Sequence, residues 1–136
     1  MFVRSCGRFA VARWEYAARG GKQLEHGMAT GEISKDLANY CNPGKGTQPV
    51  GSYQPNPFGL FDMDGNVREW CSSLEKPYPY SATDGREDAQ ATGPRILRGG
   101  GFESRDAIYL RAACRLSHPP MLCRTGIRVV VSDRSY

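Results

Sequence analysis

The stretch from residue 56 to residue 70, NPFGLFDMDGNVREW, constrains the fold more than any other part of this chain. It combines apolar side chains, glycines and oxygen-bearing side chains in an order that ordinary core packing would not need. Gly59 and Gly65 permit tight backbone paths, and Trp70 ends the stretch with a large ring that we expect to be buried. The apolar anchors and the oxygen-bearing side chains are Phe58, Leu60, Phe61, Asp62, Asn66 and Glu69. The stretch therefore predicts a tightly turning loop that offers side-chain oxygens a few residues apart.

Length and composition predict a single domain that is rich in turns. The chain has 136 residues, which is one domain of ordinary size. Its 16 glycines and 9 prolines favour irregular loops over long regular elements. The net charge of +4 comes from lysines and arginines that are scattered without a run of three, so the chain lacks the basic stripe of a nucleic-acid-binding protein.

The sequence carries no sign of membrane insertion or export. No apolar run has the length needed to cross a membrane, and residues 1–8 have too short an apolar core for a signal peptide. We therefore expect a cytoplasmic protein, unless an export signal is not part of this sequence. The five cysteines, at positions 6, 41, 71, 114 and 123, show no CxxC pair and no metal-type spacing. They favour free thiols in a reducing compartment, although one disulfide is compatible with the pattern.

A helix is predicted over residues 8–19. Gly20 and Gly21 supply its stop signal. The helical spacing is carried by Phe9, Ala12, Arg13, Tyr16 and Ala17.

The rest of the chain reads as short strands between loops. Residues 22–57 predict loops with one short helical turn near 33–38, and residues 74–94 predict a long surface loop. Strands are predicted over residues 66–72, 95–98, 108–112 and 127–132.

Several blocks, taken in order, resemble the sulfatase-modifying-factor family, which is typified by formylglycine-generating enzyme. They are WEYAARGG at 14–21, ANY at 38–40, TQPVGSY at 47–53, the 56–70 stretch, RGGGF at 98–102, LRAACR at 110–115 and GIRVV at 126–130. The resemblance covers residues 8 to 132. It implies an α+β domain over residues 1–136 with the formylglycine-generating-enzyme subtype of the C-type lectin fold. Because relatives carry a further N-terminal stretch, it also implies a minimal or truncated version, in which early strands are absent or residues 1–8 fill their role.

The resemblance does not imply an active enzyme. The family's enzyme binds copper through two cysteine thiolates, a soft ligand pair that suits Cu(I). The corresponding positions here fall on Ser104 and Ala107, and neither can form a thiolate. Relatives that use iron need a set of histidines, whereas this chain has only His26 and His118. We expect no enzymatic activity and no required cofactor, with two alternatives left open: a formylglycine-generating domain that has lost its cysteines, and a degenerate structural domain.

The C-terminal third resembles the variable proteins of diversity-generating retroelements, which share this fold. The blocks at 98–102, 107–115 and 126–129 match the framework of those proteins, and the residues between them correspond to diversified positions. Such systems randomise adenines in asparagine codons, which never yields Lys, Glu, Gln, Met or Trp. Of the 24 residues from Ser104 to Ile127, only Met121 belongs to that excluded set, where ordinary composition gives about five.

This second resemblance implies a framework and a ligand-binding segment at about 103–125. In the framework, Leu110, Ala112, Ala113, Ile127 and Val129 are expected to pack inward. Arg98, Arg111, Arg115 and Arg128 are expected to donate hydrogen bonds to loop carbonyls or carboxylates. The candidate ligand-binding residues are Ser104, Arg105, Asp106, Ile108, Tyr109, Cys114, Leu116, Ser117, His118, Pro120, Met121, Leu122, Cys123 and Thr125. The competing interpretation is that Leu116, Met121 and Leu122 fold into the core.

The family resemblance also implies a possible calcium site. Its ligands would be the side chains of Asp62 and Glu69 and the carbonyls of Gly65 and Val67, because hard oxygen ligands suit calcium. Alternatively, Glu69 accepts hydrogen bonds from backbone amides or pairs with an arginine such as Arg68 or Arg98.

The sequence therefore predicts a non-enzymatic binding protein. Its partner would be an unidentified protein or other macromolecule that contacts the variable surface, with no nucleic acid bound and no membrane insertion.

Overall fold

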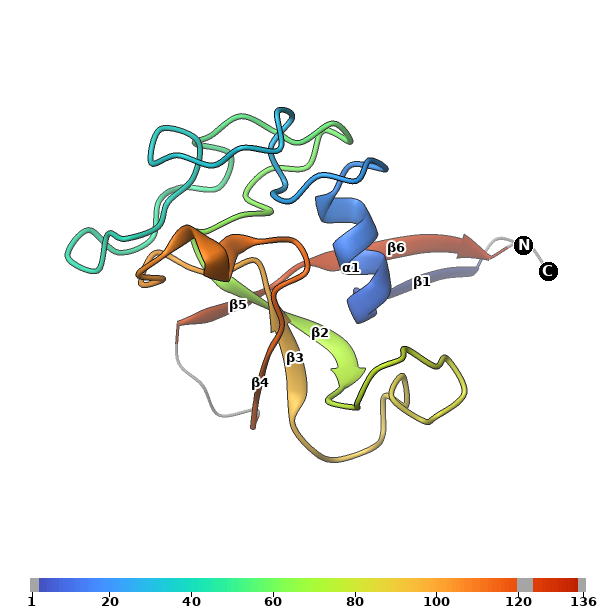
Figure 1. Ribbon diagram of the computed structural model, residues 1–136. Coiled ribbons are helices and arrows are strands. Elements are labelled where there is room, and N and C mark those ends of the chain that lie inside the picture. Colours follow the sequence, from blue (N-terminus) through green and yellow to red (C-terminus); the bar gives the residue numbers. More distant parts are fainter. Residues whose placement is uncertain (1–2, 120–123, 135–136) are drawn as a thin grey trace.

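The computed structural model describes the backbone of residues 3–119 and 124–134, and the side chains of residues 9–119 and 124–131. It contains two small sheets, one helix and long loops (Figure 1). No helix in the described part of the chain combines the length and the apolar character that crossing a bilayer requires.

Helix α1 (Val11–Ala18) forms inside the predicted range and ends where the glycines predicted. Gly20 and Gly21 both have positive φ, at 60° and 74°, which lets the chain leave the helix without strain. The residues that carry the predicted helical spacing are not the buried set, since Tyr16 is exposed and the buried residues are Val11, Trp14, Ala17 and Ala18. In so short a helix two apolar stripes fit the same spacing, and tertiary packing selects the one that contains Trp14.

The larger sheet has the strand order β4-β3-β2-β5. Its centre is the antiparallel pair β2 (Arg68–Leu74) and β3 (Arg95–Arg98), in which Glu69 lies opposite Arg98. Strand β4 (Leu116–His118) pairs antiparallel with β3, and β5 (Thr125–Ile127) pairs parallel with β2. The strands predicted at 66–72 and 95–98 are therefore confirmed.

The smaller sheet pairs β1 (Val3–Arg8) with β6 (Val129–Arg134) in antiparallel register. It extends away from the N-terminal end of α1 as a two-stranded ribbon (Figure 1). The single strand predicted over residues 127–132 is thus divided between two sheets, and Arg128 is the residue between them. Residues 3–8 do form a strand, which is one of the two roles that the sequence left open for them.

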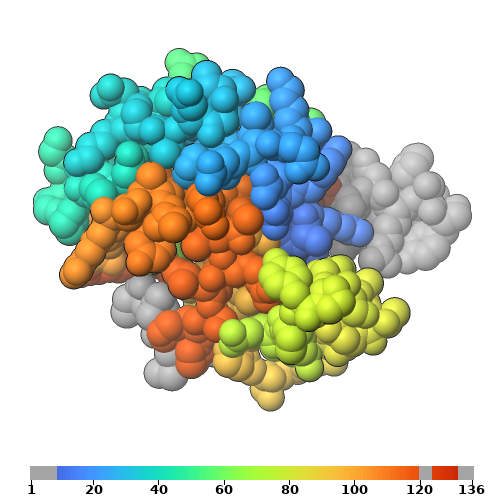
Figure 2. Space-filling view, in the orientation of Figure 1, coloured from blue at the N-terminus to red at the C-terminus, as the bar shows by residue number. Residues whose placement is uncertain are grey.

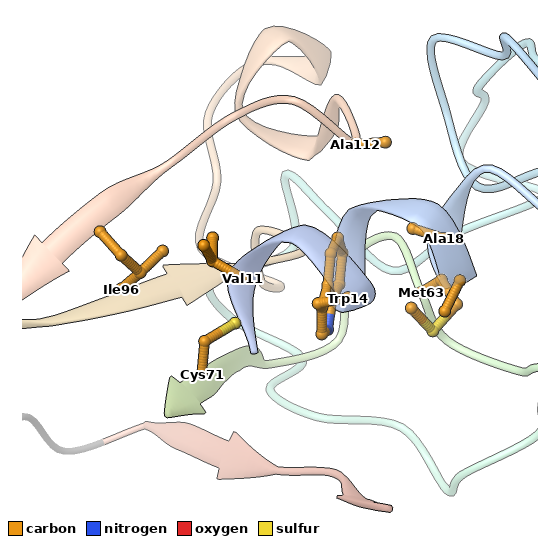
Figure 3. Packing of buried hydrophobic residues seen from close by; sticks show 8 residues of the cluster. Val11, Trp14, Ala18, Met63, Cys71, Ile96 and Ala112 are labelled. Atoms are coloured by element: carbon orange, nitrogen blue, oxygen red, sulfur yellow. The ribbon is translucent and has the colours of Figure 1, made fainter. Parts of the chain in front are cut away.

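The core lies between α1 and the larger sheet (Figure 3). Side chains of α1 pack against Met63 from the loop before β2, Cys71 from β2 and Ile96 from β3, all of them buried. This core is small, so much of the fold is held by buried polar contacts. One of them joins the Trp14 indole N–H to Glu69 Oε2 at 2.8 Å.

Several residues expected to be buried are not. Phe58 and Phe61 are exposed, and Trp70 is only half-buried, with its indole N–H donating to Thr125 Oγ1 at 2.8 Å. In the predicted framework, Ala113, Ile127 and Val129 are exposed, with Ile127 at 64% and Val129 at 56%. Strand β5 pairs only with β2, and β6 only with β1. Both strands therefore lie at sheet edges, and Ile127, Val129 and Val131 are exposed on them.

The loop after β2 is long, as predicted, but it is not a simple solvated loop. Arg86 is buried and donates to the carboxylate of Asp84 and to the carbonyl of Pro77. Its guanidinium also lies 4.6 Å from the centre of the Tyr80 ring. These contacts fix the course of the loop beside β4.

The glycine at position 65 generates a first testable prediction. Its φ is 84°, and a Cβ there would lie 2.5 Å from the Asn39 carbonyl oxygen. Gly59 has a similar φ of 74° but open space around it, so Gly59→Ala is a matched control. We expect Gly59→Ala to lower the free energy of unfolding by about 1 kcal/mol through backbone strain alone, and Gly65→Ala to lower it by roughly 3 kcal/mol because of the added clash. Urea denaturation measures both, and equal losses would contradict the close approach.

Candidate ligand-binding surface

Arg98 anchors the C-terminal segment to the core. It is the last residue of β3, only 2% exposed, and it donates to the carbonyls of Ala112 at 2.6 Å and Cys114 at 3.1 Å. A third hydrogen bond, of 2.8 Å, goes to the Glu15 carboxylate on α1. One side chain thus links the helix, the sheet and the loop that precedes β4. The planar fork of a guanidinium is suited to this because it offers several donors in fixed directions.

The other three predicted framework arginines also make the contacts expected of them. Arg115 donates to the Lys76 carbonyl at 3.1 Å, and its guanidinium lies 4.5 Å from the centre of the Tyr78 ring. Arg111 lies 3.5 Å from the Glu25 carboxylate. Arg128 pairs with Glu69 at 2.7 Å. The predicted hydrogen bonds are therefore confirmed for Arg98, Arg115 and Arg128, whereas among the described residues Arg111 forms only an exposed ion pair.

Glu15 shows how charge contributes to this bracing. Burial raises the pKa of its carboxyl, but the hydrogen bonds and positive charges of Arg19 and Arg98 outweigh burial, and the pKa lies below its usual value. A lowered pKa means that the charged contacts stabilise the fold at a pH above the unfolded-state pKa. That stabilisation is lost as the pH falls through the folded-state pKa.

The segment predicted as a strand at 108–112 is a short 3-10 helix, η1 (Ala107–Leu110), so that prediction was wrong. Asp106 caps it by accepting a hydrogen bond from the Ile108 backbone N–H at 3.0 Å. The local cap outweighs the strand propensity of an Ile-Tyr pair. As a result Leu110 is fully buried, while Ile108 and Tyr109 are 52% and 44% exposed.

Most of the predicted variable residues that the structure describes are accessible. The exposed ones are Arg105, Asp106, Ile108, Tyr109 and Leu116, and the half-buried ones are Cys114, Ser117, His118 and Thr125. The segment forms a continuous band across one face, drawn orange to red in Figure 2, between the loops of residues 20–50 and the loop after β2. Pro120, Met121, Leu122 and Cys123 lie outside the described residues.

Three members of that predicted set have roles within the fold. Ser104 is buried, and its Oγ accepts a hydrogen bond from the Gly101 N–H at 3.0 Å. Asp106 caps η1, and Thr125 accepts the hydrogen bond from Trp70. Ser104 is therefore not presented for contact with a ligand.

Several cavities border the segment, and two of them lie beside predicted variable residues. The larger, of about 680 Å³, lies between the loop after β2 and β4, and is lined by Lys76, Tyr78, Arg115, Leu116 and Ser117 among others. A second, of about 500 Å³, is lined by Cys41, Pro43, Glu103 and Arg105.

The sequence did not identify the contributions of Lys76, Tyr78, Cys41 and Pro43 to these cavities. The repeated Pro-Tyr pair at 77–80 was the only sequence feature that pointed to a role for Tyr78. Closely spaced prolines restrict the backbone, so an aromatic ring between them can be presented at the surface at low entropic cost.

The positions that correspond to the family's catalytic cysteines hold a buried serine and an alanine. Cys41 contacts this part of the chain: its backbone N–H donates to the Ser104 carbonyl, and its Sγ donates to the Arg105 carbonyl at 2.9 Å. Among the described residues no three His, Cys, Asp or Glu side chains are grouped so as to hold a metal ion. The surface can therefore offer aromatic, aliphatic and hydrogen-bonding groups to a partner, but the described side chains do not form a paired-thiolate centre.

The four predicted calcium ligands do come together. Asp62, Gly65, Val67 and Glu69 line one cavity of about 260 Å³. Neither Arg68 nor Arg98 is the partner of Glu69 in the structure, since Arg128 takes that place. Both Glu69 oxygens accept hydrogen bonds from Arg128 and one also accepts from Trp14, so the residues as arranged do not fit a bound calcium ion.

Comparisons with known proteins agree with this architecture. A protein-family model described as a sulfatase-modifying factor enzyme 1-like domain matches residues 9–133. The chain is 40% identical over 98 residues to the serine/threonine-protein kinase pkn1 of Chlamydia pneumoniae, which is 68% of this chain and 15% of that protein. It is 35% identical over 127 residues to the formylglycine-generating enzyme of Streptomyces coelicolor, which is 80% of this chain and 40% of the enzyme.

Solved structures show the same fold. Treponema denticola variable protein 1 matches with a TM-score of 0.76 and 30% identity, over 91% of this chain and 46% of that one. PvdO from Pseudomonas aeruginosa matches with a TM-score of 0.71 and 26% identity, over 91% of this chain and 51% of that one. The chain thus spans about half or less of the length of these relatives. The predicted α+β class and the formylglycine-generating-enzyme subtype of the C-type lectin fold are confirmed.

The bracing role of Arg98 is tested by Arg98→Met, which keeps length and removes the donors. We expect a loss of about 3 kcal/mol in the free energy of unfolding, because two carbonyls and a carboxylate lose their partner. Arg111→Met is the control; its exposed pair with Glu25 should contribute less than about 1 kcal/mol. The difference between wild type and Arg98→Met should shrink as the pH falls below 4.5, the ordinary value for Glu15. A loss no larger than that of the control would show that Arg98 does not brace the segment.

Proposed function

We propose a binding role for this chain, which belongs to the family of sulfatase-modifying factor enzyme 1-like domains. In this role it is a non-enzymatic variable protein whose segment at about 103–125 contacts a macromolecular ligand, and a retroelement diversifies that segment. The scaffold holds the backbone of the segment, and the side chains that differ from copy to copy define the target.

One observation carries the proposal: within one short segment, exposed apolar side chains stand next to buried side chains that anchor the segment to the core. Ile108 and Tyr109 are exposed, whereas the next residue, Leu110, and Ala112 are fully buried. Leu116, 37% exposed, extends the apolar surface beside the cavity of about 680 Å³. An exposed cluster of aromatic and aliphatic groups is costly in water unless a partner covers it, and Tyr is among the residues that contribute most to binding surfaces.

The distribution of fixed and exposed residues also supports this function. The groups that hold the segment are backbone carbonyls, which Arg98 and Arg115 bind, and these are present whatever the side chain. Replacing an exposed side chain such as Tyr109 therefore leaves the bracing contacts in place. The likeness to Treponema denticola variable protein 1 is in agreement with this arrangement.

A catalytic function is the main alternative, because curated relatives include a formylglycine-generating enzyme. Ser104 and Ala107 stand where that chemistry needs thiolates, and a hydroxyl or a methyl group cannot bind Cu(I) as a thiolate does. We therefore expect no formylglycine when the protein is incubated with Cu(I), oxygen and a cysteine-containing sulfatase peptide, as followed by mass spectrometry of the peptide. Turnover above a copper-only control would reject the binding proposal in favour of the enzyme.

The retroelement part of the proposal is tested by sequencing the DNA around the gene. We expect a near-copy of the segment that encodes residues 103–128, in which the differing positions are adenines, next to a reverse-transcriptase gene. Codons for the framework residues Leu110, Ala112 and Arg115 should be identical in the two copies. A complete genome without such a copy would contradict diversification and favour a domain of fixed sequence.

A further inference from the structure

The cavity of about 260 Å³ beside β5 contains an acidic group whose charge is balanced within the chain. Glu69 is buried on β2, and its side chain is 8% exposed. A buried carboxylate is costly unless a positive charge or several hydrogen bonds satisfy it. Two groups supply them: the indole N–H of Trp14, and Arg128 between β5 and β6.

The contacts saturate the carboxylate. Oε1 accepts from Arg128 Nε at 3.1 Å and from Nη2 at 2.7 Å. Oε2 accepts from Arg128 Nε at 3.0 Å and from Trp14 Nε1 at 2.8 Å. Each oxygen thus accepts two contacts, which come from three N–H groups because Arg128 Nε is shared between both oxygens, and together they occupy the roughly four lone-pair positions of a carboxylate. Arg128 Nη2 also donates to the Phe61 carbonyl at 2.8 Å, so the guanidinium links the loop before β2 to the C-terminal strands.

The remaining oxygens of the cavity resemble half of a cation site. Asp62 is buried, and its Oδ2 accepts a hydrogen bond from the Gly51 N–H at 2.7 Å. It lines the cavity with Gly65 and Val67, which lie on the loop directly before the strand that carries Glu69. Two carboxylates and backbone carbonyls are the ligand types that a divalent cation prefers. A positive guanidinium within the same cavity, however, repels a cation and occupies the carboxylate that it would need.

The geometry points to Arg128 as the internal replacement for a divalent cation in this cavity. It supplies the positive charge that Glu69 requires. It also joins the 56–70 loop to β5 and β6, as a metal ion bound by both would. The wild-type protein is then independent of calcium, and removal of the guanidinium opens a calcium-binding site. This inference does not depend on the proposed binding role of residues 103–125.

Thermal unfolding of the full chain in EDTA and in about 5 mM calcium chloride, well above the dissociation constants of typical sites, tests the inference. The midpoint for the wild type should be the same in both conditions. Arg128→Ala should unfold at a midpoint lower by about 5 °C or more in EDTA, and calcium should restore at least half of that loss. Magnesium should restore less, because it demands a more regular octahedron of ligands.

Two further variants place the effect at Glu69. Arg128→Lys keeps a positive charge in the cavity, so it should not respond to calcium. The double variant Arg128→Ala with Glu69→Gln should lose the response to calcium that Arg128→Ala shows.

Three results would overturn the inference. They are a rise in the wild-type midpoint with calcium, an Arg128→Ala protein that calcium does not stabilise, and a calcium response that persists when Glu69 is also replaced. Titration of the wild type with calcium chloride by calorimetry gives an independent reading if Arg128→Ala fails to fold, and binding with a dissociation constant below about 1 mM would likewise reject the inference.

Discussion

The buried guanidinium of Arg98 is the interaction on which the rest of this small domain depends. The described residues form one short α-helix, one 3-10 helix and two small sheets, which bury a limited apolar core, so loops must be held by polar contacts rather than by apolar area. Arg98 does this by binding two carbonyls of the 112–114 loop and a carboxylate of α1 at once. Arg115 and Arg128 repeat the principle at the loop after β2 and at the 56–70 loop. The arginine side chains thus fix the backbone of these loops from the side of the core. The exposed side chains of the same loops contribute little to the stability of the fold.

Much of this arrangement was predictable from local sequence. The four framework arginines were singled out by the family resemblance, because a guanidinium offers several donors to loop carbonyls and carboxylates, and each of the four does contact a carbonyl or a carboxylate. The Gly20-Gly21 stop and the strands at β2 and β3 were also read correctly, because they depend on backbone preferences within a few residues. The family likeness supplied the overall fold, which no local pattern in a chain so rich in loops would have revealed.

The errors arose where tertiary contacts decide between local alternatives. The helical spacing of residues 9–17 did not identify the buried face of α1, because packing against Met63 and Ile96 selects the face that contains Trp14. Ile127 and Val129 look like core residues in sequence, yet they are exposed on edge strands. The Asp106 cap turned a predicted strand into a 3-10 helix. At the candidate site, Tyr78 and Lys76 were missed because the loop that carries them comes to β4 only through the stacking and hydrogen bonding of Arg115.

We infer that buried framework residues hold the fold, while the exposed side chains of the segment can be replaced freely. The free energy of unfolding of a variant with several surface substitutions tests this most directly. Ile108→Ser, Tyr109→Ser and Leu116→Ser combined should change the free energy of unfolding by about 1.5 kcal/mol or less, since exposed substitutions rarely exceed about 0.5 kcal/mol each. The single framework substitution Leu110→Ala, at a fully buried position, should by contrast cost about 3 kcal/mol. Should the triple surface variant lose as much stability as Leu110→Ala, those side chains would belong to the framework, and the segment would not be a surface free to vary.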